Sequence, residues 1–236
     1  MTKADIKSKH SKLIALLLFC LIFIIDYLIL TQIPQPALFH GLQWNWQGKI
    51  LSTLWALVII YGFKFLSPKE VGLVHPRSNK DYRFALYFGF LCSAIIFILD
   101  LSQDTSFLSS SEISLETILF QLVMPGINEE LVYRGILLAV LNRAFTKKWS
   151  FLSIKFGFGA VLVSILFVLI HTVQITPEHT LWLNTNIFDW LALIFFAMVF
   201  VLMREKTGSI WPGVIFHGLI DGMHFVLAYL LMVMGA

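Results

Sequence analysis

The chain has 236 residues, of which 58% are hydrophobic and 13% are charged, and its formal net charge is +3. Because a soluble domain carries about 25% charged residues, this composition excludes a soluble globular protein and indicates a polytopic membrane protein. The basic residues occur in short blocks between apolar runs, a pattern that gives no support for nucleic-acid binding.

Seven apolar segments follow one another along the chain, each near the roughly 20 residues that a helix needs to cross a bilayer. They cover approximately residues 13–30, 50–66, 84–101, 117–141, 153–172, 188–203 and 211–234. The connections between them are rich in residues that form turns and end helices. We therefore expect an all-α membrane protein, a bundle of about seven transmembrane helices with an intramembrane polar site.

The number of lysine and arginine residues alternates between high and low in successive connections between these segments. The N-terminal stretch and the second, fourth and sixth connections carry four, five, four and two such residues. The first connection carries only Lys49, and the third and fifth connections and the C-terminus carry none. Since cytoplasmic loops are enriched in lysine and arginine, this pattern predicts a cytoplasmic N-terminus and an outer C-terminus.

The fourth segment contains the stretch PGINEELVYRGIL, which brings Glu129, Glu130 and Arg134 into apolar surroundings. Charges inside a membrane segment are costly, so they indicate either a functional site or a structural ion pair between helices. Glu130 and Arg134 are four residues apart on one helix face and are expected to pair. Glu129 is rotated by about 100° from Glu130 and is expected to face another group.

His171 ends the fifth segment, in the stretch SILFVLIHTV. If residues 143–155 form the turn of an antiparallel helix pair, Glu129 and His171 lie roughly 21 and 24 Å from that turn. The two side chains are then at nearly the same height in the membrane. A carboxylate and an imidazole at one level can together hold a water molecule and remove its proton.

The last segment carries a polar stripe, in the stretch WPGVIFHGLIDG. His217 and Asp221 are one helical turn apart and share a face, and His224 continues the stripe. Glycines beside the stripe allow a neighbouring helix to approach closely, so we expect an interior site or interhelical hydrogen bonds. Counted from the start of its helix, His217 is roughly 8 Å deep, well over 10 Å from the level of His171. A tilt or a re-entrant link is needed to bring the two histidines together.

Three motifs occur in order along the last four segments: EELVYR at 129–134, FVLIH at 167–171 and HGLID at 217–221. Together they resemble the CPBP family, also called Abi or type II CAAX-protease-like intramembrane proteases, over about residues 115–230. The resemblance implies a catalytic core of four helices at residues 115–236. Residues 1–114 would form an N-terminal three-helix segment of the same integrated membrane domain.

The resemblance also implies roles for the polar residues of the first two motifs. Glu129 and His171 would activate the attacking water, and Glu130 and Arg134 would support that geometry as a pair. No cofactor is expected, although Glu129, His171 and His217 are residue types that bind zinc. The sequence contains no His-Glu-x-x-His motif, and a metal-free glutamate mechanism uses the same residues.

The third motif would stabilise the oxyanion that forms on the scissile carbonyl. Many members of the family have asparagine at the position of Asp221. Because an ionised aspartate cannot donate a hydrogen bond, Asp221 is expected to orient His217 and favour its protonated form, so that His217 donates to the oxyanion.

The expected function is that of an intramembrane endopeptidase acting on a membrane-associated peptide or protein within the lipid bilayer. The resemblance connects bacterial relatives with bacteriocin immunity or the maturation of peptide toxins and pheromones, and eukaryotic ones with prenylated CAAX proteins. The small size of the chain favours the bacterial kind, in the cytoplasmic membrane. The alternative is a non-enzymatic immunity protein or a small transporter, and the absence of internal repeats counts against a transporter.

Overall fold

The structure is a computed structural model that describes residues 3–33, 36–103, 113–175, 181–184 and 186–234. Most of the described chain is helical. Within it, four helical stretches are long and apolar enough to cross a membrane: His10–Gln32, Asn79–Leu99, Ile187–Thr207 and Trp211–Met234. They belong to helices α1 (Lys3–Gln32), α3 (Asn79–Gln103), α7 (Ile187–Thr207) and α8 (Trp211–Met234).

The other helices are shorter or interrupted. A short 3₁₀ turn, η1 (Ala37–Phe39), precedes α2 (Trp46–Leu57), which continues into the π-helical turn η2 (Val58–Gly62). The fourth segment forms one helical path through α4 (Leu115–Glu129), the π-helical η4 (Glu130–Leu137) and α5 (Leu138–Ala144). The fifth segment forms α6 (Phe158–Thr172). Helices therefore occupy all seven predicted segments, although only four of them have the length and composition of a span in the described residues.

The expectation of an all-α chain was wrong in two places, where the described residues form antiparallel β-hairpins. One pairs β1 (Lys148–Phe151) with β2 (Ile154–Gly157), and the other pairs β3 (Val173–Ile175) with β4 (Leu181–Leu183). In the first hairpin, aromatic and β-branched residues alternate with polar ones, which favours strands. Leu152 and Ser153 have φ angles of 46° and 64°, as in the tight turn of a two-residue hairpin. The fifth helix consequently begins at Phe158, five residues later than predicted.

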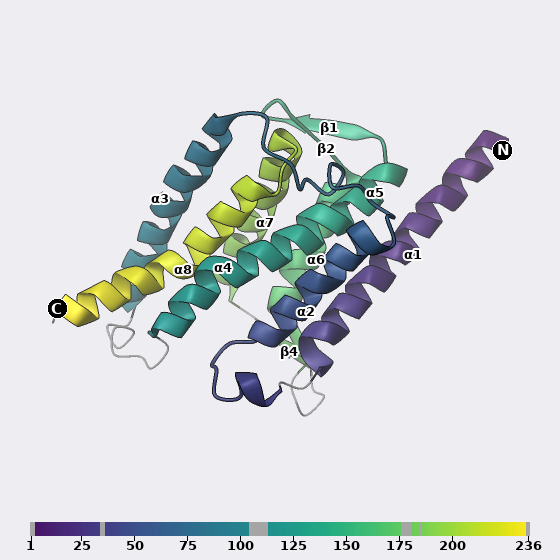
Figure 1. The fold of residues 1–236 in the computed structure, drawn as a ribbon. Coiled ribbons are helices and arrows are strands. Elements are labelled where there is room, and N and C mark those ends of the chain that lie inside the picture. Colours follow the sequence, from purple (N-terminus) through teal and green to yellow (C-terminus); the bar gives the residue numbers. More distant parts are fainter. Residues whose placement is uncertain (1–2, 34–35, 104–112, 176–180, 185, 235–236) are drawn as a thin grey trace.

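The helices form a bundle in which α8 packs against both α3 and α4, while α1 and α2 lie on the other side of α4 (Figure 1). The two chain ends lie at opposite ends of this bundle, and the β1–β2 hairpin lies at the same end as the N-terminus (Figure 1). Close packing of α4 on α8 depends on glycine, as the sequence predicted. A Cβ atom at Gly218, beside the polar stripe of α8, would clash with the backbone oxygen of Leu122.

The turn between α7 and α8 lies inside the protein, beneath the chain that precedes α3. Gly208 ends α7 in the left-handed conformation, with φ of 73°. Ile210 N–H then donates to Gly72 O at 3.0 Å, and Ser209 Oγ donates to Val74 O at 2.6 Å. Both Ser209 and Ile210 are buried. The chain around Gly72 therefore covers the turn that leads into α8 and fixes where this helix begins.

Candidate active site

The predicted site residues meet in one cavity of about 500 Å³ between the helices. All four residues predicted to be catalytic line it, which are Glu129, His171, His217 and Asp221. Residue counting placed the two histidines at different levels, whereas in the structure both line this cavity. Helix α6 begins five residues later than predicted, so fewer helical residues separate its start from His171.

The helix that carries both glutamates is locally irregular. Pro125 lies inside α4, where it has no N–H for the carbonyl of Gln121 and its ring crowds that carbonyl. Four residues later the backbone changes from α-helical to π-helical, at the junction between Glu129 and Glu130. Such π turns occur frequently at functional sites because they re-aim side chains within a helix.

Glu130 and Arg134 form the predicted pair, and both side chains are fully buried. Arg134 Nη1 lies 3.1 Å from Glu130 Oε1. The guanidinium carbon lies 4.0 Å from the ring centre of Phe167 and 4.6 Å from that of Phe200. The guanidinium makes no hydrogen bond to the described residues. Charge attraction and the faces of two aromatic rings therefore hold it.

His217 contacts three carboxylates and is 3% exposed. Its Nδ1 lies 3.2 Å from Glu130 Oε1, and its Nε2 lies 3.2 Å from Asp221 Oδ2 and 3.7 Å from Glu129 Oε2. The predicted His217–Asp221 contact is present, but it uses the Nε2 atom. Glu130, which the sequence assigned to Arg134 alone, fixes the other side of the ring. Since ionised carboxylates only accept, both ring nitrogens of His217 are arranged as donors.

His171 has the opposite arrangement of hydrogen bonds. Its Nδ1 lies 2.7 Å from the carbonyl oxygen of Phe167, one turn earlier in α6. A carbonyl can only accept, so Nδ1 carries a proton, and in the neutral imidazole Nε2 keeps a free electron pair. The Phe167 ring centre lies 4.3 Å from that of His171 and 6.3 Å from that of His217. The phenylalanine of the Phe-x-x-x-His motif therefore packs against both histidines and Arg134.

Glu129 has a partner that the sequence analysis missed. Lys49 Nζ lies 2.6 Å from Glu129 Oε1, and the two side chains are 15% and 11% exposed. The sequence places Lys49 in the first connection, whereas in the structure Lys49 lies in the first turns of α2 and lines the cavity. A signal was available, because Lys49 stands alone in a connection that the positive-inside rule predicts to be free of lysine.

A second buried polar cluster lies beside this ion pair and was also missed. Asp26, in the last two turns of α1, is 1% exposed and accepts a hydrogen bond from Ser52 Oγ in α2. Ser52 Oγ in turn accepts from Asn128 Nδ2 at 2.6 Å. An aspartate within an apolar segment was the available signal, since intramembrane carboxylates are rare and need partners. His224, predicted to extend the stripe of α8, packs on Phe225 and does not line the cavity.

The residues do not fit a zinc ion in this arrangement. Both ring nitrogens of His217 face carboxylates, and Glu129 Oε1 is held by Lys49. Among the described residues, no group of three or more histidine, cysteine, aspartate or glutamate side chains is arranged to bind a metal. A zinc ligand set of Glu129, His171 and His217 would require these contacts to break.

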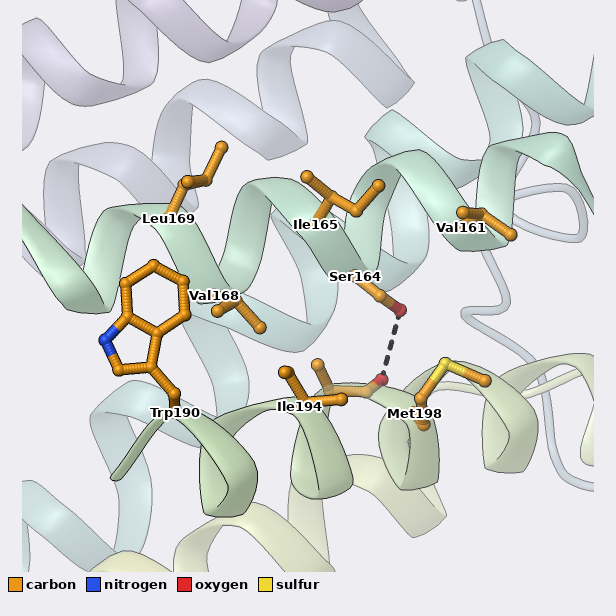
Figure 2. A pocket seen from close by; sticks show the side chains of 9 residues that line it. Val161, Ser164, Ile165, Val168, Leu169, Trp190, Ile194 and Met198 are labelled. Carbon is orange, nitrogen blue, oxygen red and sulfur yellow. Dashed lines mark hydrogen bonds between the residues drawn. The ribbon is translucent and has the colours of Figure 1, made fainter. Parts of the chain in front are cut away.

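A second cavity, of about 320 Å³, lies between α6 and α7 and differs in chemistry (Figure 2). Its lining is apolar apart from Ser164, whose Oγ donates to the Ala197 carbonyl at 3.4 Å. Figure 2 shows Trp190 and Met198 at its two ends on α7. None of its lining residues is ionisable, so it offers no group for acid–base chemistry.

Ionisable groups gathered around a cavity inside a bundle of apolar helices define an integral membrane protein with a polar site among its helices. Residues 111–223 match the family described as type II CAAX prenyl endopeptidase Rce1-like. This match confirms the resemblance drawn from the three motifs. Comparisons with curated proteins and with solved structures gave no match. Lys49 and Asp26 lie outside the matched residues.

Proposed function

We propose that this protein is an intramembrane endopeptidase that cleaves a membrane-associated peptide or protein with a water molecule activated by Glu129 and His171. One observation carries the proposal: two proton acceptors and one donor surround a single cavity. The acceptors are Glu129 Oε2, which is buried and accepts no hydrogen bond from the described residues, and His171 Nε2. The donor is His217 Nε2, 3.7 Å from Glu129 Oε2.

In the first step, Glu129 Oε2 removes a proton from a water molecule that His171 Nε2 also binds. The water oxygen forms a bond to the carbonyl carbon, and the electron pair of the carbonyl double bond moves to its oxygen. In the second step that double bond re-forms, the carbon–nitrogen bond breaks, and the leaving amine takes the proton from Glu129. These two steps consume one water and produce a carboxylic acid and an amine; the remaining water proton then moves from the acid to the amine, which gives a carboxylate and an ammonium group.

The oxyanion of the first step is stabilised by the Nε2–H of His217. The orientation of the His217 ring is set on its Nδ1 side, because Nδ1 donates to Glu130 and Glu130 is held by Arg134. Before the reaction, His217 Nε2 contacts Asp221, whose side chain is 30% exposed. The oxyanion competes with Asp221 for the same Nε2–H donor. The donor therefore turns from Asp221 toward the carbonyl oxygen as negative charge develops there.

We further propose that the chain spans the membrane seven times, with a cytoplasmic N-terminus and an outer C-terminus. The alternating lysine and arginine counts support this topology, as do the chain ends at opposite ends of the bundle. The name of the matched family points to a prenylated C-terminal CAAX peptide as one substrate class. Maturation of a bacterial peptide, or immunity to one, is the other function that fits a bacterial cytoplasmic membrane.

The test uses purified protein in nanodiscs and an internally quenched, S-farnesylated peptide that ends in a CAAX sequence. Glu129→Gln and His171→Ala should each lower kcat by about a hundredfold or more, as loss of a general base does. Lys12→Met, on an exposed residue away from the cavity, should retain wild-type rates. In parallel, peptides of membranes that contain wild-type protein or Glu129→Gln are compared. Equal cleavage by wild type and Glu129→Gln would contradict the mechanism. No cleavage and identical peptides would favour the non-enzymatic alternative.

The third motif is tested on the same substrate. His217→Ala should lower kcat about a hundredfold or more, as the loss of an oxyanion donor does. Asp221→Asn should retain activity at about one tenth of the wild-type level, since its amide is itself a donor. Wild-type activity in His217→Ala would remove α8 from the proposed mechanism.

A further inference from the structure

We infer that Lys49 is a positioning residue of the active site: it holds Glu129 Oε1, so that Oε2 is turned toward His217 and the cavity. The inference rests on the proposed role of Glu129 as proton acceptor. It assigns a function to α2, which lies outside the family-matched residues 111–223.

The geometry of the Glu129 carboxylate carries the first step. Its two oxygens have different surroundings, because Oε1 is 2.6 Å from Lys49 Nζ and Oε2 is 3.7 Å from His217 Nε2. Rotation about the last bond of a glutamate side chain is broad and weakly restricted when neither oxygen is held. A short charge-assisted hydrogen bond to one oxygen removes this freedom. Lys49 therefore determines which oxygen of Glu129 is presented to the water.

The second step is that hydrogen bonds join the backbone segments that carry the two ends of this ion pair, since Asn128 donates to both Ser52 and Thr53 of α2. Asn128, the residue before Glu129, donates to Ser52 Oγ at 2.6 Å, and Ser52 donates to Asp26 in α1. Thr53, beside Ser52, donates to the Lys49 carbonyl at 2.8 Å. The chain joins α1, α2 and α4 directly beside Glu129. Such a buried connection positions the two charged side chains relative to each other and leaves little room for adjustment.

The third step concerns charge. Around the cavity, the carboxylates of Glu129, Glu130 and Asp221 face Arg134, His217 and Lys49. Arg134 and His217 both lie against Glu130, whereas Lys49 supplies the short contact to Glu129. Loss of Lys49 would leave Glu129 with only the longer contact to His217 among the ion pairs of the described residues. Its carboxylate would then reorient toward that histidine.

The experiment measures kcat and KM for Lys49→Met, Lys49→Arg and Lys12→Met, with the farnesylated peptide or a peptide that accumulates in Glu129→Gln membranes. Lys49→Met should lower kcat by about 10- to 100-fold with KM within about threefold, as a misplacement near 1 Å does. Lys49→Arg keeps the charge and a donor and should recover at least part of that loss. Lys12→Met should match wild type.

The inference is overturned if Lys49→Met keeps wild-type kcat, if only KM changes, or if Lys49→Arg is no better than Lys49→Met. If Lys49→Met does not fold, Lys49→Leu replaces it, since leucine also lacks a donor for Glu129 Oε1, and the same three criteria apply. Failure of the proposed function can be distinguished from failure of the positioning role. In the first case wild type itself cleaves neither peptide, and the inference is then overturned as well. If wild type and Lys49→Met cleave equally well, the proposed function stands and the positioning role is lost.

Discussion

Replacing Arg134 by alanine tests how the buried charges are stabilised. The ion pair with Glu130 is completely buried, and breaking such a pair typically costs about 3–5 kcal/mol because the remaining charge has no partner. The alanine also removes the cation from between Phe167 and Phe200, where a desolvated cation–π contact is worth about 2 kcal/mol. The two losses share one side chain and do not add fully, so we expect about 3–5 kcal/mol in total.

For a chain of this length, that loss corresponds to a decrease in Tm of about 6–20 °C. The assay is thermal unfolding in one detergent at one heating rate, with the expression level as a second measure. The matched control is Arg143→Ala at the end of the same helical path, because the Arg143–Glu70 pair is 42% and 38% exposed. Exposed pairs contribute about 0–1 kcal/mol, so its Tm should fall by no more than a few degrees.

The double variant Glu130→Gln/Arg134→Met provides the second control. Removing both charges avoids an unpaired buried ion, so this variant should be more stable than Arg134→Ala, although His217 loses one partner. Wild-type Tm and expression in Arg134→Ala would refute the reasoning. Such a result would mean that Glu130 is satisfied by His217 alone.

Three further predictions follow from other parts of the chain. The hydrogen bond from Arg143 lowers the pKa of Glu70 to about 2. The pair therefore stabilises the fold fully above about pH 4.5, and this contribution decreases as the pH falls toward 2. The Tm difference between wild type and Glu70→Gln should shrink over that interval. Gly213→Ala would bring a Cβ atom to 2.6 Å from Glu130 Oε2, and the resulting overpacking should cost about 1–3 kcal/mol in unfolding experiments. Reporter domains fused after residue 75 and at the C-terminus should report opposite sides of the membrane, and the same side for both would exclude seven spans.

Helix positions and local pairs could be predicted because they depend on short-range spacing. Apolar segment length located a helix in every predicted segment, and the four-residue spacing correctly paired Glu130 with Arg134 and His217 with Asp221. The β1–β2 hairpin was missed because a run of apolar residues longer than a strand hid its alternating pattern. An apolar run alone does not distinguish a strand from a buried helix.

The long-range contacts of the site could not be read from spacing. Lys49 and Glu129 are 80 residues apart, and nothing in either segment specifies the other as its partner. The meeting of His171 and His217 at one cavity depends on how the helices pack around it, which residue counting along α8 does not contain. The spacing of the Phe-x-x-x-His motif likewise does not predict that the face of the Phe167 ring packs against Arg134.

The order of the charged residues along the chain has a consequence for synthesis and membrane insertion. Membrane proteins are made from the N-terminus, so in the proposed seven-span topology α2 and α4 enter the bilayer before α8 exists. At that stage Glu129 and Glu130 do not yet have His217, but each has another partner available: Lys49 lies in the already inserted α2, and Arg134 lies one turn further in the same helical path. The emerging helix is therefore not left with a single unpaired charge in lipid, a state that is costly. In that topology His217 arrives last, into a site whose acidic groups are already held, so the arrangement of the candidate site is completed at the end of insertion.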